Sequence, residues 1–211
     1  MKNSRIIISL LTLTLWAVAA WAQTPQEIIS RMETEMNSHD KSEGFIMTLD
    51  IKIPILGTVS SKNYILEDKM RMEATVAGEK TISWTDATTN WTYSSKDNKI
   101  KIENAKANKD SQSDDNLSLF QGITEGYNVS IKKEDDAAWY LHCKKSKSNK
   151  DKDAPKNMDL VVSKANYYPL SLSASMKGIK MTIRDISFGV TEEDVTFNIK
   201  DFPGAEVEDL R

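Results

Sequence analysis

The chain has 211 residues, of which 39% are hydrophobic and 28% charged, with 28 Lys and Arg against 31 Asp and Glu. That length and apolar content are enough for one domain with a substantial core. The formal net charge of −3 argues against a nucleic-acid-binding protein, which would be basic.

The N-terminal segment 1–22 is expected to be a secretory signal peptide. Lys2 and Arg5 precede an apolar run at 6–18, and an Ala-Trp-Ala cleavage motif follows. The run is too short and too often interrupted by Ser and Thr for a membrane-spanning helix of ~20 residues. We expect a single mature domain of residues 23–211. No cysteine stands directly after the cleavage site for lipid attachment, so we expect this domain to be released as a soluble protein outside the cytoplasm.

A helix is expected to open the mature chain. Thr24 as N-cap, Pro25 as first helical residue and Glu27 three residues after the cap form a capping box. The apolar residues that follow recur at helical spacing and predict one buried stripe. They are Ile28, Ile29, Met32 and Met36.

Alternation with a period of two begins after Gly44 and predicts a strand over 45–53, which Pro54 ends. A short helix, expected to act as a lid, is predicted from Leu117 to Ile123. About a dozen short strands in hairpin order with two or three helices predict an α+β fold that is mainly antiparallel, either a curved sheet or an open barrel. Further strands are expected at 64–66, 70–74, 82–84, 91–93, 100–102, 127–132, 139–144, 158–163, 168–175, 180–188 and 195–199.

No catalytic constellation is visible in the sequence. His142 and Cys143 are adjacent on an expected strand, so their side chains point to opposite faces. With His39 isolated near the end of the first helix, no His, Cys and carboxylate cluster has metal-ligand spacing. We therefore expect no enzyme, no metal and no cofactor. The lysine-rich stretch 144–156 is interpreted as a solvated loop rather than an anionic-partner site.

The apolar face of the expected sheet is rich in methionine beside tryptophan. Methionine adapts to variable apolar shapes, so this composition suits a surface for apolar ligands, although taken alone it favours a methionine-rich core. The methionines are Met32, Met36, Met47, Met70, Met72, Met158, Met176 and Met181.

Two segments resemble the bacterial periplasmic lipoprotein carriers of the Lol pathway. In the stretch 79–102, Thr85-Asp86 and Trp91-Thr92-Tyr93 match that family's turn and its aromatic-x-Tyr strand. In 195–211, Pro203-Gly204 and the Val-x-Asp ending are similar to the family's closing segment.

This resemblance implies a LolA/LolB-like unclosed half β-barrel of about 10–12 strands with a helical lid. It also implies a periplasmic carrier that shelters the acyl chains of lipoproteins, or of a related lipid, on the way to the outer membrane. An inner-membrane release complex and an outer-membrane acceptor would be its partners. The alternatives are a non-transporting lipid or lipoprotein sensor, an enzyme acting on envelope lipids, and a structural envelope protein with a filled barrel.

Fifteen residues are expected to form the apolar cavity and its lid. They are Ile28, Met32, Met36, Met47, Leu49, Met70, Met72, Trp84, Trp91, Tyr93, Leu117, Phe120, Ile123, Met176 and Met181.

The chain departs from the family pattern at the gate. Characterised carriers place an arginine just before the turn that precedes a Phe-x-Trp strand, but the corresponding stretch here, 65–69, contains none. The Phe-x-Trp pair is replaced by Met70 and Met72. Arg71 lies between them and is expected on the opposite face of the strand, so the gate role is not transferred to it.

Overall fold

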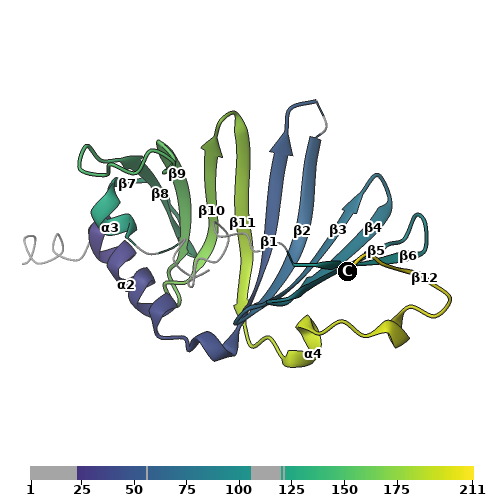
Figure 1. The fold of residues 1–211 in the computed structure, drawn as a ribbon. Coiled ribbons are helices and arrows are strands. Elements are labelled where there is room, and N and C mark those ends of the chain that lie inside the picture. The colour runs from purple at the N-terminus through teal and green to yellow at the C-terminus, as the bar shows by residue number, and fades with distance from the viewer. Residues whose placement is uncertain (1–22, 56, 106–119, 121) are drawn as a thin grey trace, which may run out of the picture.

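The computed structural model describes residues 23–55, 57–105, 120 and 122–211. The predicted signal peptide and most of the predicted lid helix, including Leu117, lie outside the described residues. The body is one sheet that curves without closing, with strand order β12-β6-β5-β4-β3-β2-β1-β11-β10-β9-β8-β7 (Figure 1). All neighbouring pairs are antiparallel except β12 with β6. The predicted α+β fold with an unclosed half barrel is therefore confirmed.

The strands have these bounds: β1 Phe45–Ile53, β2 Gly57–Leu66, β3 Lys69–Val76, β4 Glu79–Thr85, β5 Thr89–Ser94, β6 Lys99–Asn104, β7 Tyr127–Glu134, β8 Ala138–Lys145, β9 Asn157–Ser163, β10 Pro169–Met176, β11 Ile179–Phe188 and β12 Glu206–Asp209. The described helices are α2 Pro25–Asn37, α3 Ile123–Gly126 and α4 Glu192–Val195, with 3-10 turns at Lys41–Glu43 and Ile199–Asp201.

Helix α2 begins as the sequence predicts. The Thr24 hydroxyl accepts a hydrogen bond from the Glu27 amide at 3.2 Å, and the Glu27 carboxylate accepts one from the Thr24 amide at 2.8 Å. These bonds satisfy amides that have no partner within the helix. The predicted stripe is fully buried at all four of its positions.

Two segments differ from the sequence-based expectation. β2 begins at Gly57 rather than near residue 64, because its polar part, 57–63, pairs with 47–53 of β1. The predicted strand at 195–199 is wrong. A capping box between Thr191 and Asp194 starts α4 there, and the strand at this end of the chain is β12.

The strand register divides the side chains between two faces of the sheet. Phe45 on β1 lies opposite Ile65 on β2, which lies opposite Met70 on β3, so the three share a face. Phe45 and Ile65 also belong to the core cluster that includes α2. We call this the inner face. Arg71 and Trp84 pair with each other and point to the opposite, outer face.

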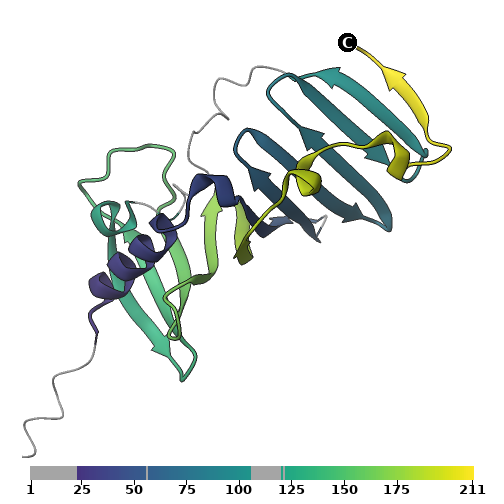
Figure 2. The same cartoon turned by 90° about the horizontal axis from the view of Figure 1, so that it is seen from below.

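Helix α2 and α3 cover the inner face at the β7–β9 end of the sheet (Figure 2). The side chains buried with them come mainly from β8 and β9. Those of β8 and β9 are Leu141, Cys143, Met158, Leu160 and Val162, and Phe120 and Ile123 belong to the same buried cluster.

The C-terminal segment 190–211, which we call the C-terminal strap, crosses the other end of the sheet (Figures 1 and 2). It leaves β11, passes through α4 and the turn Ile199–Asp201, and ends as β12 alongside β6. Arg71 ties it to the outer face, because its guanidinium donates a hydrogen bond to the Asp194 carbonyl at 3.0 Å. The two ends of the sheet are therefore covered on opposite faces.

Candidate functional site

The middle of the inner face is an apolar surface that its own helices do not fully bury. Side chains of β11, β1 and β3 line it with a period of two, as the register requires. Each is partly exposed, whereas the α2 stripe is fully buried. This surface, which we call the central strip, comprises Met47, Leu49, Ile51, Met70, Met72, Met181 and Ile183.

The polar groups beside the central strip satisfy one another. Ser61 and Asn63, on the inner face of β2, are both buried. The Asn63 amide nitrogen donates to the Ser61 carbonyl and can also donate to the Ser61 hydroxyl, each at 3.2 Å. Because unpaired buried polar groups are costly, this local pairing lets an apolar surface continue from β1 to β3.

One carboxylate of α2 joins this helix to α3 through hydrogen bonds. Glu33 accepts hydrogen bonds from the amides of Ile123 and Thr124, at 3.0 and 3.3 Å, and from the Thr124 hydroxyl at 2.8 Å. A carboxylate at a helix start satisfies the free amides there. The two helices are thereby joined as one cover.

Polar and aromatic contacts also hold α2. Gln23, just before the helix, and Arg31, in its middle, both donate hydrogen bonds to the Tyr167 hydroxyl, at 2.7 and 2.9 Å. Beyond the end of the helix, His39 stacks on Phe188 with ring centroids 3.6 Å apart. The cover is therefore held by these contacts as well as by its apolar packing.

The structure does not bring the fifteen predicted site residues together. Met47, Leu49, Met70, Met72, Met176 and Met181 lie on the inner face of the sheet, and Ile28, Met32, Met36, Phe120 and Ile123 lie in the cover packed against that face. Leu117 is outside the described residues. The remaining three, Trp84, Trp91 and Tyr93, lie on the outer face.

The three outer-face aromatics form a cluster with the C-terminal strap. Phe197 stacks on Trp91 at 5.6 Å between centroids and meets Trp84 edge-on at 5.3 Å, and Phe202 contacts Tyr93 at 4.4 Å. Edge-to-face and offset contacts of this kind stabilise beyond the area they bury. These aromatics hold the strap in place and do not line the surface that α2 covers.

Arg71 is committed to the outer face, as its position between two methionines predicts. Its guanidinium pairs with Glu73 and lies over the Tyr64 ring at 4.6 Å. Burial raises the pKa of Glu73, but the hydrogen bonds from Arg71 and Lys80 outweigh it, and the net pKa is lowered. Arg71 is thus a structural partner of the strap.

Cys143 and His142 do not form a reactive pair in the structure. Burial raises the pKa of the Cys143 thiol to about 11, which leaves it protonated and unreactive at neutral pH. His142 points away from it, to the Asp159 carboxylate at 2.9 Å. Over the part of the chain that the structure describes, no group of three or more His, Cys, Asp or Glu is placed to hold a metal ion.

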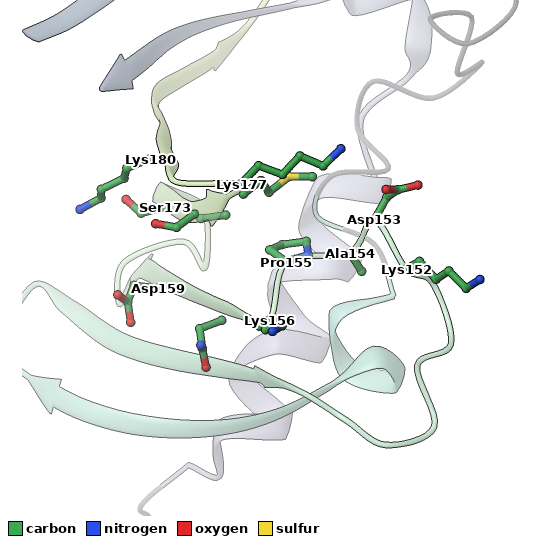
Figure 3. Close-up of a pocket in the computed structure, with 13 residues that line it drawn as sticks. Lys152, Asp153, Ala154, Pro155, Lys156, Asp159, Ser173, Lys177 and Lys180 are labelled. Carbon is green, nitrogen blue, oxygen red and sulfur yellow. The ribbon is translucent and has the colours of Figure 1, made fainter. Parts of the chain in front are cut away.

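A hollow of about 600 Å³ lies at the rim of the sheet, between the loop before β9 and the β10–β11 hairpin (Figure 3). Ala154, Pro155, Ala174 and Met176 contribute its apolar lining. Its charged lining comes from Lys152, Asp153, Lys156, Asp159, Lys177 and Lys180.

Sequence reasoning missed part of this site. Ile51 and Ile183 belong to the central strip but were not among the predicted residues, although their alternation with Leu49 on β1 and Met181 on β11 was a usable signal. Phe197 and Phe202 were also missed. Nothing in the local pattern shows that the C-terminal segment folds back on the sheet.

Comparison with known proteins shows the fold. The chain matches no family model and no curated protein sequence. Among solved structures, the lipoprotein LppX of Mycobacterium tuberculosis is similar with a TM-score of 0.50 and 10% identity, over 80% of this chain and 98% of LppX. LprF of Mycobacterium bovis is similar with a TM-score of 0.49 and 10% identity, over 79% of this chain and 93% of LprF. A LolA superfamily protein of Nitrosomonas europaea, NE2245, has a TM-score of 0.31 and 10% identity, over 83% of this chain and 99% of NE2245.

At 10% identity, the likeness to LppX establishes a shared fold and nothing finer. Together with the unclosed sheet and its few helices, it identifies this chain as having the LolA-like open-barrel fold. None of the described helices has both the length and the apolar character needed to cross a membrane.

Proposed function

We propose that this protein is a periplasmic carrier that shelters acyl chains of lipoproteins, or of a related lipid, against its central strip. Its task would be delivery towards the outer membrane, with an inner-membrane release complex and an outer-membrane acceptor as partners. The observation that carries the proposal is a partly exposed apolar surface on the inner face of the sheet, beside a helical cover.

The energetics suit reversible binding. A sixteen-carbon acyl chain gains on the order of 10 kcal/mol when it leaves water, at ~0.8 kcal/mol per methylene. Uncovering the four buried side chains of α2 costs about 6–12 kcal/mol, at ~1.5–3 kcal/mol for each. Because these two quantities are similar, an acyl chain that displaced α2 would bind without becoming trapped.

The fastening of α2 fits the same cycle. Its apolar stripe has no directional bonds to the sheet, whereas the contacts of Glu33, Arg31 and His39 are directional. Apolar packing can exchange one apolar surface for another, because it depends on area rather than on orientation. An acyl chain could therefore replace the stripe while these directional contacts keep the cover attached.

The test uses a fluorescent sixteen-carbon fatty acid and two matched variants of β3. Met72→Asp places a charge on the central strip, and Thr75→Asp places the same charge on the exposed outer face of the same strand. We expect Met72→Asp to weaken binding by about a hundredfold, because a buried unpaired carboxylate is strongly disfavoured. Thr75→Asp should stay within about twofold of the wild type.

Circular dichroism would first show that both variants are folded. Equal affinities for the two folded variants would remove the central strip from the binding site. Native mass spectrometry of protein purified from the periplasm adds an independent readout, since a carrier should retain lipid or acylated protein.

A further inference from the structure

The two rims of the sheet differ in charge. Because the strands are antiparallel, successive turns lie at opposite rims. The turns at one rim include 54–55, 77–78, 95–98, 146–156 and 177–178, and their sequence carries six lysines and three aspartates. We call it the hairpin rim. The turns at the other rim are 67–68, 86–88, 135–137 and 164–168, and they carry five acidic residues and one lysine.

The hairpin rim also carries exposed apolar side chains. Ile55 at the β1–β2 turn is fully exposed. Val76, beside the β3–β4 turn, is 52% exposed, and Ile179, beside the β10–β11 turn, is 40% exposed. In Figure 1 the β1–β2 and β10–β11 hairpins rise side by side from the sheet at this rim. Isolated exposed apolar residues are ordinary, but here three different hairpins present one at the same rim.

Several lysines of the hairpin rim are free to bind a partner. Lys152, Lys156 and Lys177 line the rim hollow and have no ion-pair partner among the described residues (Figure 3). The Asp159 carboxylate in the same lining is already paired, with Lys132 at 2.8 Å and with His142. The unpaired charge of the hollow is therefore mainly positive.

We propose that the hairpin rim docks this protein on the surface of an anionic bilayer. Apolar tips that enter the interface, surrounded by lysines that reach the headgroups, are the combination that peripheral membrane proteins use. The acidic rim at the other ends of the strands would face away from the membrane. The inference rests on charge and exposure at the rim and not on the proposed cargo.

The test measures binding of the mature full-length chain to vesicles by co-sedimentation. Vesicles of phosphatidylglycerol and phosphatidylethanolamine provide the anionic surface, and phosphatidylcholine vesicles provide the neutral one. We expect binding to the anionic vesicles only, and we expect it to be lost when the salt concentration is raised about fivefold, because salt screens surface charges.

Two pairs of matched variants locate the surface. The triple change Lys152→Glu, Lys156→Glu and Lys177→Glu should weaken vesicle binding by about a hundredfold. Lys101, Lys133 and Lys200 are exposed but lie outside the hairpin rim. The same change to glutamate at these three residues should leave most of the vesicle binding intact. Ile55→Ser should weaken binding by about tenfold, and Leu170→Ser, at an exposed residue near the opposite rim, should not.

The inner-face variant Met72→Asp separates docking from cargo uptake. It should bind vesicles like the wild type even though it binds fatty acid about a hundredfold more weakly. Absence of vesicle binding, equal binding to neutral vesicles, or equal losses in the two lysine triples would each overturn the docking proposal and leave the acyl-chain proposal standing.

Discussion

A single glycine allows three segments of the chain to meet closely at the start of β1. Gly44 precedes β1 with φ +58°, in the left-handed region that glycine tolerates best. A Cβ at this position would lie 2.5 Å from the Ile65 carbonyl oxygen and 2.9 Å from the Val190 Cβ. The chain therefore needs a residue without a side chain where β1, β2 and the start of the strap meet.

We expect Gly44→Ala to lower the free energy of unfolding by about 3 kcal/mol or more, because backbone strain and a steric clash act together. Gly78→Ala is the matched control. Its φ is +84°, but nothing lies within 4 Å of an added Cβ, so it should cost only about 1 kcal/mol. Urea denaturation of both variants measures the difference, and equal losses would show that contact with Ile65 is unimportant.

At the scale of elements, the C-terminal strap extends the sheet and covers its outer face. β12 adds a short parallel strand to β6, which would otherwise be an edge strand with unpaired backbone groups. The aromatic cluster between the strap and the outer face buries Trp84 almost completely. Pairing and aromatic packing support each other, so the strap depends on both.

Phe197→Ala should therefore destabilise the protein by about 2 kcal/mol and shift its tryptophan fluorescence towards that of exposed tryptophan. Ile199→Ala, two residues along the same strap, is the control, because this side chain is 46% exposed. Urea unfolding followed by fluorescence reports both effects. An unchanged spectrum in Phe197→Ala would mean that the stacking on Trp91 does not shape the environment of the tryptophans.

At the scale of the whole molecule, the sheet has one end closed by its helical cover and a middle that stays partly open. The proposed cycle requires the cover to move as a unit while β8 and β9 stay in place. The hydrogen bonds of Glu33 between α2 and α3 are consistent with such a unit.

Hydrogen exchange tests this movement directly. Saturation with fatty acid should raise amide exchange in α2 by about tenfold or more and leave exchange in β8 and β9 unchanged, because the helix leaves its packed position while the sheet does not. Exchange with and without ligand, followed by mass spectrometry, gives the comparison. Greater protection of α2 in the bound state would show that the ligand binds without displacing the cover.

Local patterns in the sequence determined most of the elements and the class of fold. The capping box at Thr24, the period-two run from Phe45 and the turn residues between strands act over a few neighbouring positions, so they can be read without a structure. The hairpin order then indicates a mainly antiparallel fold, either a curved sheet or an open barrel. The family resemblance agrees with the same fold.

The tertiary structure alone decided which face each residue occupies. Alternation assigns Met72 and Trp84 to faces of their own strands, but only the pairing of β3 with β4 shows that these faces are opposite. The same holds for the C-terminal strap, whose phenylalanines meet their partners across about a hundred residues of chain. Contacts between distant segments depend on how the sheet twists and pairs, and no local spacing encodes them.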